Sequence, residues 1–151
     1  NAKVWPQFMV FVPDTELATK AARGILPENV SRQDAIYNVS RSGLLVASLG
    51  SGNWCENPQL LKTALQDKLH QPYRAPLMPA FDAVQNAALE SGALGGTLSG
   101  AGPSILIWLD ADSKSTFKER LKLSVLKAAA AKGVSGKVIE LEVDTLGCVE
   151  N

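Results

Sequence analysis

Residues 95–104 form a run with glycine at four of ten positions, and it lies between two short apolar segments. Glycine accepts positive φ angles and has no side chain, so this backbone can approach another group closely. The N–H groups between the glycines could bind an anion. Glycine-rich turns are common, however, and glycine content alone favours a tight hairpin that binds nothing. The run therefore predicts either a hairpin or a backbone that supports a phosphate.

The composition of the chain fits one compact domain with its own core. It has 151 residues, of which 46% are hydrophobic. Fifteen basic and fifteen acidic residues cancel and form no long run of one sign, so nothing in the charge favours nucleic acid or an anionic membrane. The two cysteines lie in no metal or redox motif. Since no long apolar stretch or secretory leader occurs, we expect a soluble, cytoplasmic protein with reduced thiols.

Hydrophobic periodicity predicts a strand and two helices in the first third of the chain. Residues 7–12 contain β-forming side chains, and residues 15–23 contain good helix formers. A longer helix is expected from Ser31, which forms a capping box with Asp34, to about Gly50. The apolar stripe of this helix consists of Ile36, Val39, Gly43 and Val46.

The middle of the chain predicts two more helices with a loop between them. An Asn-Pro pair at 57–58 marks a helix start, and leucines at positions 61, 65 and 69 make that helix amphipathic. Three prolines predict that residues 70–79 form a loop that displays its side chains, including Arg74. The next helix is expected over residues 79–91, with Gly92 as its cap.

The last third predicts a strand, a helix and a strand. Apolar residues at 105–109 form the first strand, and Ser113 can cap a helix that runs to Ala131. Residues 137–143 alternate, which places Ile139 and Leu141 on the face expected to be covered. Short apolar segments frame the glycine run at 93–94 and 105–109, so the order of elements is strand, helices, strand, strand, helix, strand. This order predicts an α+β, ferredoxin-like fold with a four-stranded antiparallel sheet packed against helices.

Several strings of the sequence resemble those of a known kinase family. Gly-Thr-Leu-Ser-Gly-Ala-Gly-Pro-Ser, at residues 96–104, resembles the third motif of the GHMP kinases, which phosphorylate small molecules with ATP. The strings at 12–23, 26–27, 38–41 and 69–74 resemble those of one branch, the homoserine kinases, and occur in the same order. The resemblance covers residues 8–143 and implies the C-terminal domain of such a kinase, which is ferredoxin-like.

The main phosphate-binding motif of that family, a Pro-x-x-x-Gly-Leu-Gly-Ser-Ser-Ala-Ala type of loop, does not occur in this sequence. The resemblance therefore implies that residues 1–151 are a single domain without the N-terminal ATP-binding lobe. The whole enzyme would use ATP and Mg²⁺ to convert L-homoserine into O-phospho-L-homoserine for threonine biosynthesis. We expect this chain alone to be inactive and to bind neither cofactor tightly, with its catalytic groups and metal ligands on the other lobe.

The resemblance also implies which residues bind the substrate. Arg23 and Arg74 lie in motifs that contact substrate in the family, and a guanidinium can form two parallel hydrogen bonds to the homoserine carboxylate. Thr19 could add a hydroxyl to that pocket, although threonine in a helix often bonds its own backbone. Asn38 and Arg41 match an Asn-x-x-Arg pattern and could contact either the substrate or the other lobe.

The glycine run would support the transferred phosphate from the C-terminal side. The supporting residues implied are Gly96, Thr97, Ser99, Gly100, Ala101 and Gly102. The only histidine, His70, ends a predicted helix and has no nucleophile in a recognisable arrangement with it, so anchoring its loop is favoured over a general-base role.

Other functions remain open at this stage. Another GHMP kinase with a different alcohol as substrate would share the glycine run, although the string at 69–74 favours the homoserine branch. A non-catalytic ferredoxin-like module that binds amino acids, or a purely structural interaction domain, would show the same alternating strands. The expected partners are L-homoserine, ATP and the N-terminal lobe of the same polypeptide, and a homodimer could form through the surface that would face that lobe.

Overall fold

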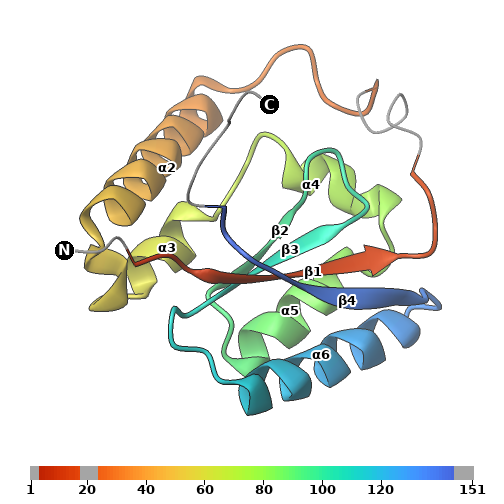
Figure 1. Cartoon of the computed structure of the whole chain (residues 1–151). Coiled ribbons are helices and arrows are strands. Elements are labelled where there is room, and N and C mark those ends of the chain that lie inside the picture. The colour runs from red at the N-terminus through yellow and green to blue at the C-terminus, as the bar shows by residue number, and fades with distance from the viewer. Residues whose placement is uncertain (1–3, 18–23, 145–151) are drawn as a thin grey trace, which may run out of the picture.

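The computed structural model describes residues 4–17 and 24–144, and four strands form one antiparallel sheet (Figure 1). The strands are β1 (Gln7–Pro13), β2 (Gly95–Leu98), β3 (Ile105–Leu109) and β4 (Gly136–Leu141). Their order in the sheet is β2-β3-β1-β4. The helices are α2 (Arg32–Ser51), α3 (Gln59–Ala64), α4 (Gln71–Arg74), α5 (Phe81–Ser91) and α6 (Ser115–Ala130), with 3-10 turns η1 (Asn53–Cys55) and η2 (Ala75–Leu77). The predicted α+β, ferredoxin-like fold is confirmed.

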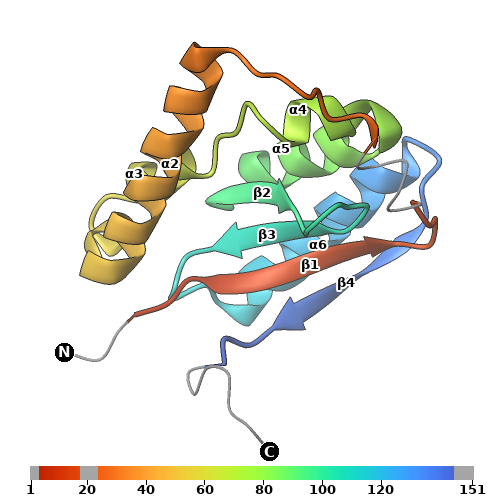
Figure 2. The same cartoon turned by 90° about the horizontal axis from the view of Figure 1, so that it is seen from above.

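Helices α5 and α6 lie side by side against one face of the sheet, where the main core forms (Figures 1 and 2). Alternate residues of the central strands point to this face, because side chains alternate along a strand. The helices contribute one buried residue per turn, which matches the predicted apolar faces of both. The buried residues at the centre of this core are Met9, Phe11, Val84, Ala88, Ile105, Ile107, Leu109, Leu121 and Val125.

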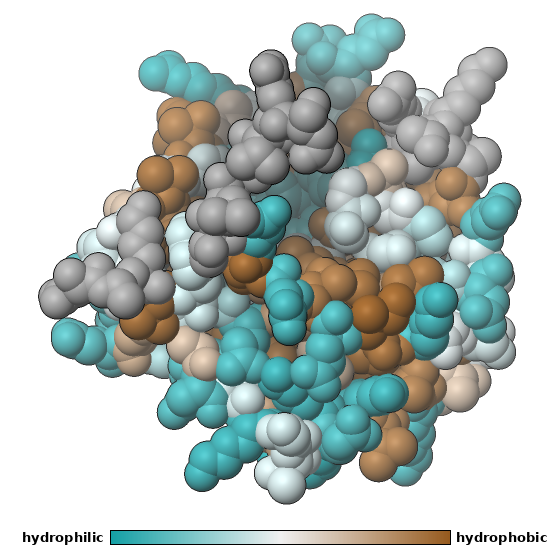
Figure 3. All heavy atoms as spheres, in the orientation of Figure 1, coloured by the Kyte–Doolittle hydropathy of each residue, from teal (hydrophilic) through white to brown (hydrophobic). Residues whose placement is uncertain are grey.

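The opposite face of the sheet is apolar but carries neither α5 nor α6. Phe8 of β1 pairs with Trp108 of β3 and Leu141 of β4, and the rings of Phe8 and Trp108 meet edge to face at 4.8 Å. Ile139 and Leu141 are about 40% exposed, whereas the buried residue of β4 is Val138. The prediction that the Ile139 face is covered is therefore wrong. Figure 3 shows a band of hydrophobic side chains in the middle of the molecule.

Glu140 explains why the alternation of β4 misleads. It lies on the same side as Val138, toward α6, and accepts a hydrogen bond of 2.9 Å from Lys118 of that helix. The aliphatic stem of a lysine can cover apolar surface while its ammonium group reaches a carboxylate. The polar side of β4 is therefore the helix-covered side.

Helix α2 begins and ends close to its predicted bounds but packs through a different face. The Ser31 hydroxyl accepts the Asp34 N–H at 3.0 Å, and Gly52 forms a left-handed cap. The predicted stripe is exposed instead of buried, since Val39 and Val46 are both 73% exposed. The other side of α2 packs against a second core, which is smaller than the main one. This second core consists of Trp54, Leu61 and Leu94, with Leu45, Leu49, Trp108 and Ala111 around it.

Three other predicted bounds are wrong for identifiable reasons. Helix α3 ends at Ala64: the N–H groups of the next two residues still bond to backbone carbonyls, but that of Lys68 donates to Asn38 Oδ1 at 2.9 Å instead of continuing the helix. The proline-rich loop contains α4 and η2, with proline in the first turn of each, where its missing N–H costs nothing. Helix α6 starts at Ser115, since Ser113 lies in a turn bonded to Asp110.

The predicted helix over 15–23 falls largely outside the described residues, and its first three residues are not helical. Leu17 packs against the main core. Among the helices in residues 4–17 and 24–144, none has the length and apolar character needed to cross a membrane.

Candidate functional site

The glycine run divides into a base and a tip. The base consists of Gly95, Gly96 and Gly102, and the tip consists of residues 99–101. A Cβ atom on Gly95 would lie 2.5 Å from Leu65 Cδ1, and one on Gly102 would lie 2.7 Å from the sulfur of Met78. The base glycines are therefore needed for close packing.

The first part of the run is strand β2, which pairs antiparallel with β3, so the run forms the hairpin that its glycine content favours. The Trp108 indole N–H donates to the Thr97 hydroxyl at 3.0 Å. Gln85 donates to the Gly96 carbonyl at 2.6 Å, and the Leu98 N–H donates to Gln71 Oε1 at 3.0 Å. The Gln85 and Gln71 side chains therefore occupy backbone groups on the outer edge of β2, which would otherwise be open to pairing with another strand.

The tip is the part of the run that faces solvent. Ser99 and Gly100 are exposed, and Ala101 is half-buried. Gly100 has a φ of +59°, and no atom lies within 4 Å of the position where its Cβ would be. The Ser99 N–H donates to the Ser104 carbonyl at 2.9 Å, and the Gly102 N–H donates to the Ser99 carbonyl at 3.1 Å, which closes the turn. The tip thus combines a fixed backbone with open space beside Gly100.

Arg74 lies beneath the tip and is only 6% exposed, so the prediction that it is displayed on a loop is wrong. It ends α4, one helical turn after His70. Its Nη1 contacts His70 Nε2 and donates a long hydrogen bond of 3.4 Å to the Gly100 carbonyl. Helix α4 and the tip are therefore joined through the Arg74 guanidinium.

The Asp67 carboxylate fixes the start of α4. It accepts the backbone N–H groups of Leu69, His70 and Gln71 at 3.2, 2.8 and 2.6 Å. The Asn38 amide donates to it at 2.5 Å. Although burial alone would raise the pKa of Asp67, these hydrogen bonds hold that pKa below its ordinary value. Asp67 is not among the predicted site residues, but an aspartate just before a Gln-Pro helix start was a usable signal.

His70 has an electrostatic environment that favours its neutral form. Burial of the ring and the charge of Arg74 lower the pKa of His70, against the opposing effects of Asp67 and of a hydrogen bond with the Gly100 backbone. The ring contacts both Arg74 and the Gly100 region, as expected of a loop anchor.

Asn38 and Arg41 lie on the inner side of α2, one turn apart. The Asn38 amide is engaged at both ends, with Asp67 and with the Lys68 N–H. The Arg41 guanidinium stacks on the Tyr37 ring at 4.2 Å, and its Nε is buried with no hydrogen-bond partner among the described residues. Asn38 is therefore connected to Arg74 through Asp67 and α4, whereas Arg41 retains a donor.

Two predicted substrate residues, Thr19 and Arg23, lie outside the described residues. The segment that precedes them, residues 15–17, lines a cavity of about 290 Å³ together with Leu77 and Met78, just after α4. Residues 15–17 therefore lie beside the turn η2, which follows α4.

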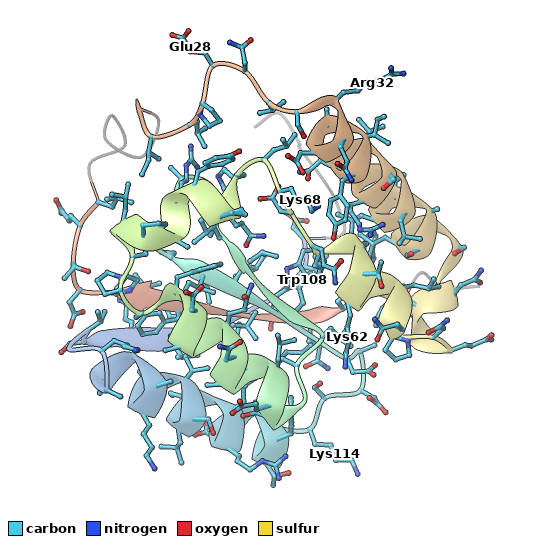
Figure 4. All side chains as sticks on the ribbon, turned by 180° about the vertical axis from the view of Figure 1, so that it is seen from behind. Glu28, Arg32, Lys62, Lys68, Trp108 and Lys114 are labelled. Carbon is cyan, nitrogen blue, oxygen red and sulfur yellow. The ribbon has the colours of Figure 1, made fainter. Side chains whose placement is uncertain are left out.

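A larger cavity, of about 600 Å³, lies on the outer side of the β2 edge. Lys62, Lys68 and Asp82 are among its lining residues. Lys68 lies on the loop before α4 (Figure 4), and its ammonium group pairs with Asp34 of α2 at 3.6 Å and lies 4.6 Å from the centre of the Tyr37 ring. No group of three or more acidic, histidine or cysteine side chains that could hold a metal ion occurs in the part of the chain that the structure describes.

Comparison with known proteins places these features in a family. Residues 45–128 match the family model of the GHMP kinase C-terminal domain. The chain is 46% identical over 139 residues to the homoserine kinase of Nostoc punctiforme and 44% identical over 148 residues to that of a Synechococcus strain, covering 92% of this chain in both cases. It spans 43% and 47% of those two relatives, less than half of their length.

A solved structure gives the same result for the fold. The crystal structure of homoserine kinase from Cytophaga hutchinsonii superimposes with a TM-score of 0.82 at 30% identity. The match covers 93% of this chain and 42% of that one. The arrangement of sheet and helices described above is therefore shared with part of a larger chain.

Proposed function

Because this chain belongs to the GHMP kinase family, whose C-terminal domain it matches, we propose that the whole polypeptide is an ATP-dependent homoserine kinase. It would transfer the γ-phosphoryl group of ATP to the side-chain hydroxyl of L-homoserine, giving O-phospho-L-homoserine and ADP for threonine biosynthesis in the cytoplasm. The observation that carries this proposal is 46% identity to a homoserine kinase over 92% of the chain. This chain would supply the substrate side of the active site.

The substrate carboxylate is assigned to Arg74 and Arg23. A guanidinium that is 6% exposed and held by His70 has little freedom, so it can receive a carboxylate in one orientation with a small further loss of entropy. Thr19 would add a hydroxyl to the same pocket, and the unpartnered Nε of Arg41 is a further donor. Asn38 would act on the substrate indirectly, since both ends of its amide are engaged.

The phosphate is assigned to the tip of the glycine run. The N–H groups of Ser99 and Gly102 close the turn, which leaves those of Gly100 and Ala101 as the candidate donors. The open space beside Gly100 is the feature that fits a phosphate, because a side chain there would occupy it. Gly96 and Thr97 would support the site from below through the β2 edge.

ATP and Mg²⁺ would be held mainly by the other half of the polypeptide. Bound Mg²⁺ neutralises charge on the phosphates during phosphoryl transfer. This chain's part is to orient the amino acid at Arg74 and to present backbone donors at the tip. The N-terminal lobe of the same polypeptide is the expected partner, and a homodimer remains a prediction.

The test is an assay of the full-length polypeptide with ATP and a panel of small alcohols. We expect ADP release that depends on L-homoserine and a rise of at least tenfold in the KM for homoserine in Arg74→Ala. Arg74→Lys is the matched control, because it keeps the charge but loses the second parallel hydrogen bond. Its KM for homoserine should lie between those of the parent and Arg74→Ala. Preference for another alcohol would retain the kinase class and reject homoserine as substrate. Turnover of none of these alcohols would favour a binding module.

A further inference from the structure

The function proposed above uses the contact between His70 and Arg74 only to restrict the Arg74 guanidinium. The two residues lie four apart at the two ends of α4, so their side chains emerge on the same side of the helix. Arginine is always protonated and can only donate, so the ring nitrogen that meets it, Nε2, must be the acceptor. The His70 ring is therefore neutral in this arrangement and carries its hydrogen on Nδ1.

The same pair converges on the tip of the glycine run. Arg74 donates to the Gly100 carbonyl, and the His70 ring also forms a hydrogen bond with the Gly100 backbone. The charged groups that act on the ring are Arg74 from α4 and Asp67 from the preceding loop, and Asp67 also holds the His70 N–H at 2.8 Å. Both the backbone and the ring of His70 are thus held in place.

We propose that neutral His70 is a positioning residue, which holds the Arg74 guanidinium and the tip of the glycine run in fixed relation. This proposal rests on the proposed function, in which Arg74 binds the amino-acid carboxylate and the tip faces the phosphate. Holding the two together sets how far the substrate hydroxyl lies from the transferred phosphoryl group, and a misplacement of about 1 Å in such a geometry can cost about 100-fold in rate. His70 touches neither substrate in this arrangement.

Kinetics of two variants in the full-length polypeptide test the proposal. His70→Leu fills the space without an acceptor, whereas His70→Gln keeps an oxygen that can accept from Arg74. We expect His70→Leu to lower kcat and to raise the KM for homoserine, each at least tenfold, with less than a twofold change in the KM for ATP. We expect His70→Gln to stay within threefold of the parent in all three quantities. An equal loss of activity in His70→Leu and His70→Gln, or an equal change in the KM values for homoserine and ATP, would overturn the positioning role.

A second readout does not depend on homoserine. Nitrogen-15 NMR of the His70 ring in the full-length polypeptide, assigned by its loss in His70→Leu, should show a neutral ring with hydrogen on Nδ1 at pH 7. A charged ring or hydrogen on Nε2 would overturn the proposal whatever the substrate. If the parent phosphorylates another alcohol, the proposed function is wrong, and the ratio of KM values measured with that alcohol decides the role of His70.

Discussion

The base and the tip of the glycine run contain the same residue type for different reasons. At the base, Gly95 leaves room for Leu65, and an added Cβ would come within 2.5 Å of that side chain. At the tip, a Cβ atom on Gly100 would have no neighbour within 4 Å, and the residue adopts a φ of +59°, a conformation that other residues enter at a cost. A motif shared by a kinase family thus combines a packing requirement with an exposed backbone. Substitutions at the base should mainly lower stability, whereas substitutions at the tip should mainly lower activity.

The support beneath the tip should give the largest effect on stability. Asp67→Asn removes the charge that accepts three backbone N–H groups and the Asn38 amide, and hydrogen bonds to a charged group contribute about 1.5–3 kcal/mol. We expect a loss of about 2 kcal/mol in the free energy of unfolding at pH 7, measured by urea denaturation. The base should be little affected, so strand β2 should keep its hydrogen-exchange protection while the tip loses it.

This effect should depend on pH in a defined direction. The pKa of Asp67 is lower in the folded chain than its ordinary value of 3.8, so its contribution is fully present above that value and is lost as the pH falls through the folded pKa. The difference between the parent and Asp67→Asn should therefore shrink below about pH 4. A difference that is constant from pH 7 to pH 3 would contradict the role assigned to this carboxylate.

At the base, Gly95→Ala should cost about 1.5 kcal/mol, less than Asp67→Asn, since overpacking costs about 1–3 kcal/mol and the clash here is with a flexible side chain. The clash is with the end of one side chain, so Leu65→Ala in the same protein should remove it. A double-mutant cycle on the free energy of unfolding measures this, with coupling of at least 1 kcal/mol expected. Strict additivity of the two substitutions would show that Gly95 is not needed for packing.

At the tip, Gly100→Ala should have the smallest effect on stability and a separate effect on activity. The left-handed conformation costs an alanine about 1 kcal/mol, and no neighbour is displaced. In the full-length polypeptide we expect kcat to fall about tenfold, because the added methyl group would occupy the space assigned to the phosphate and displace the phosphate from the backbone donors. Gly43→Ala is the matched control, because Gly43 is an exposed glycine in the interior of α2. This substitution should stabilise the helix by up to about 1 kcal/mol and leave kcat unchanged.

The sequence predicted best those elements whose local signals agree with their packing. Ser31 and Asp34 mark the start of α2, and Gly92 ends α5 with a φ of +107°, as their residue types require. The prediction fails where tertiary contacts decide. Glycines at 95 and 96 have low strand propensity, yet pairing with β3 and close contact with Leu65 and Gln85 hold them in β2. Glu140 is on the helix-covered side because of Lys118, which no pattern within β4 could show.

The candidate site also divides into features that the sequence predicts and features that depend on tertiary contacts. Arg74 and the glycine run were found because their strings resemble a family, but the burial of Arg74 and its contact with the tip are three-dimensional facts. Asp67 was not predicted although it stands just before a Gln-Pro helix start, and its bond with Asn38, which lies 29 residues earlier, has no signal in the sequence. Thr19 and Arg23 stay predictions, since they lie outside the described residues.

The most direct test of the account is reconstitution of the active site from two halves. This chain would be mixed with a separately expressed N-terminal lobe, and ADP release would be followed with and without L-homoserine, with association of the halves checked by gel filtration. We predict homoserine-dependent turnover in the mixture only, and at least a tenfold loss when this chain carries Arg74→Ala. ADP release by this chain without the N-terminal lobe would contradict the claim that the chain supplies the substrate side of a homoserine kinase. The absence of ADP release from two halves that do associate would contradict it as well.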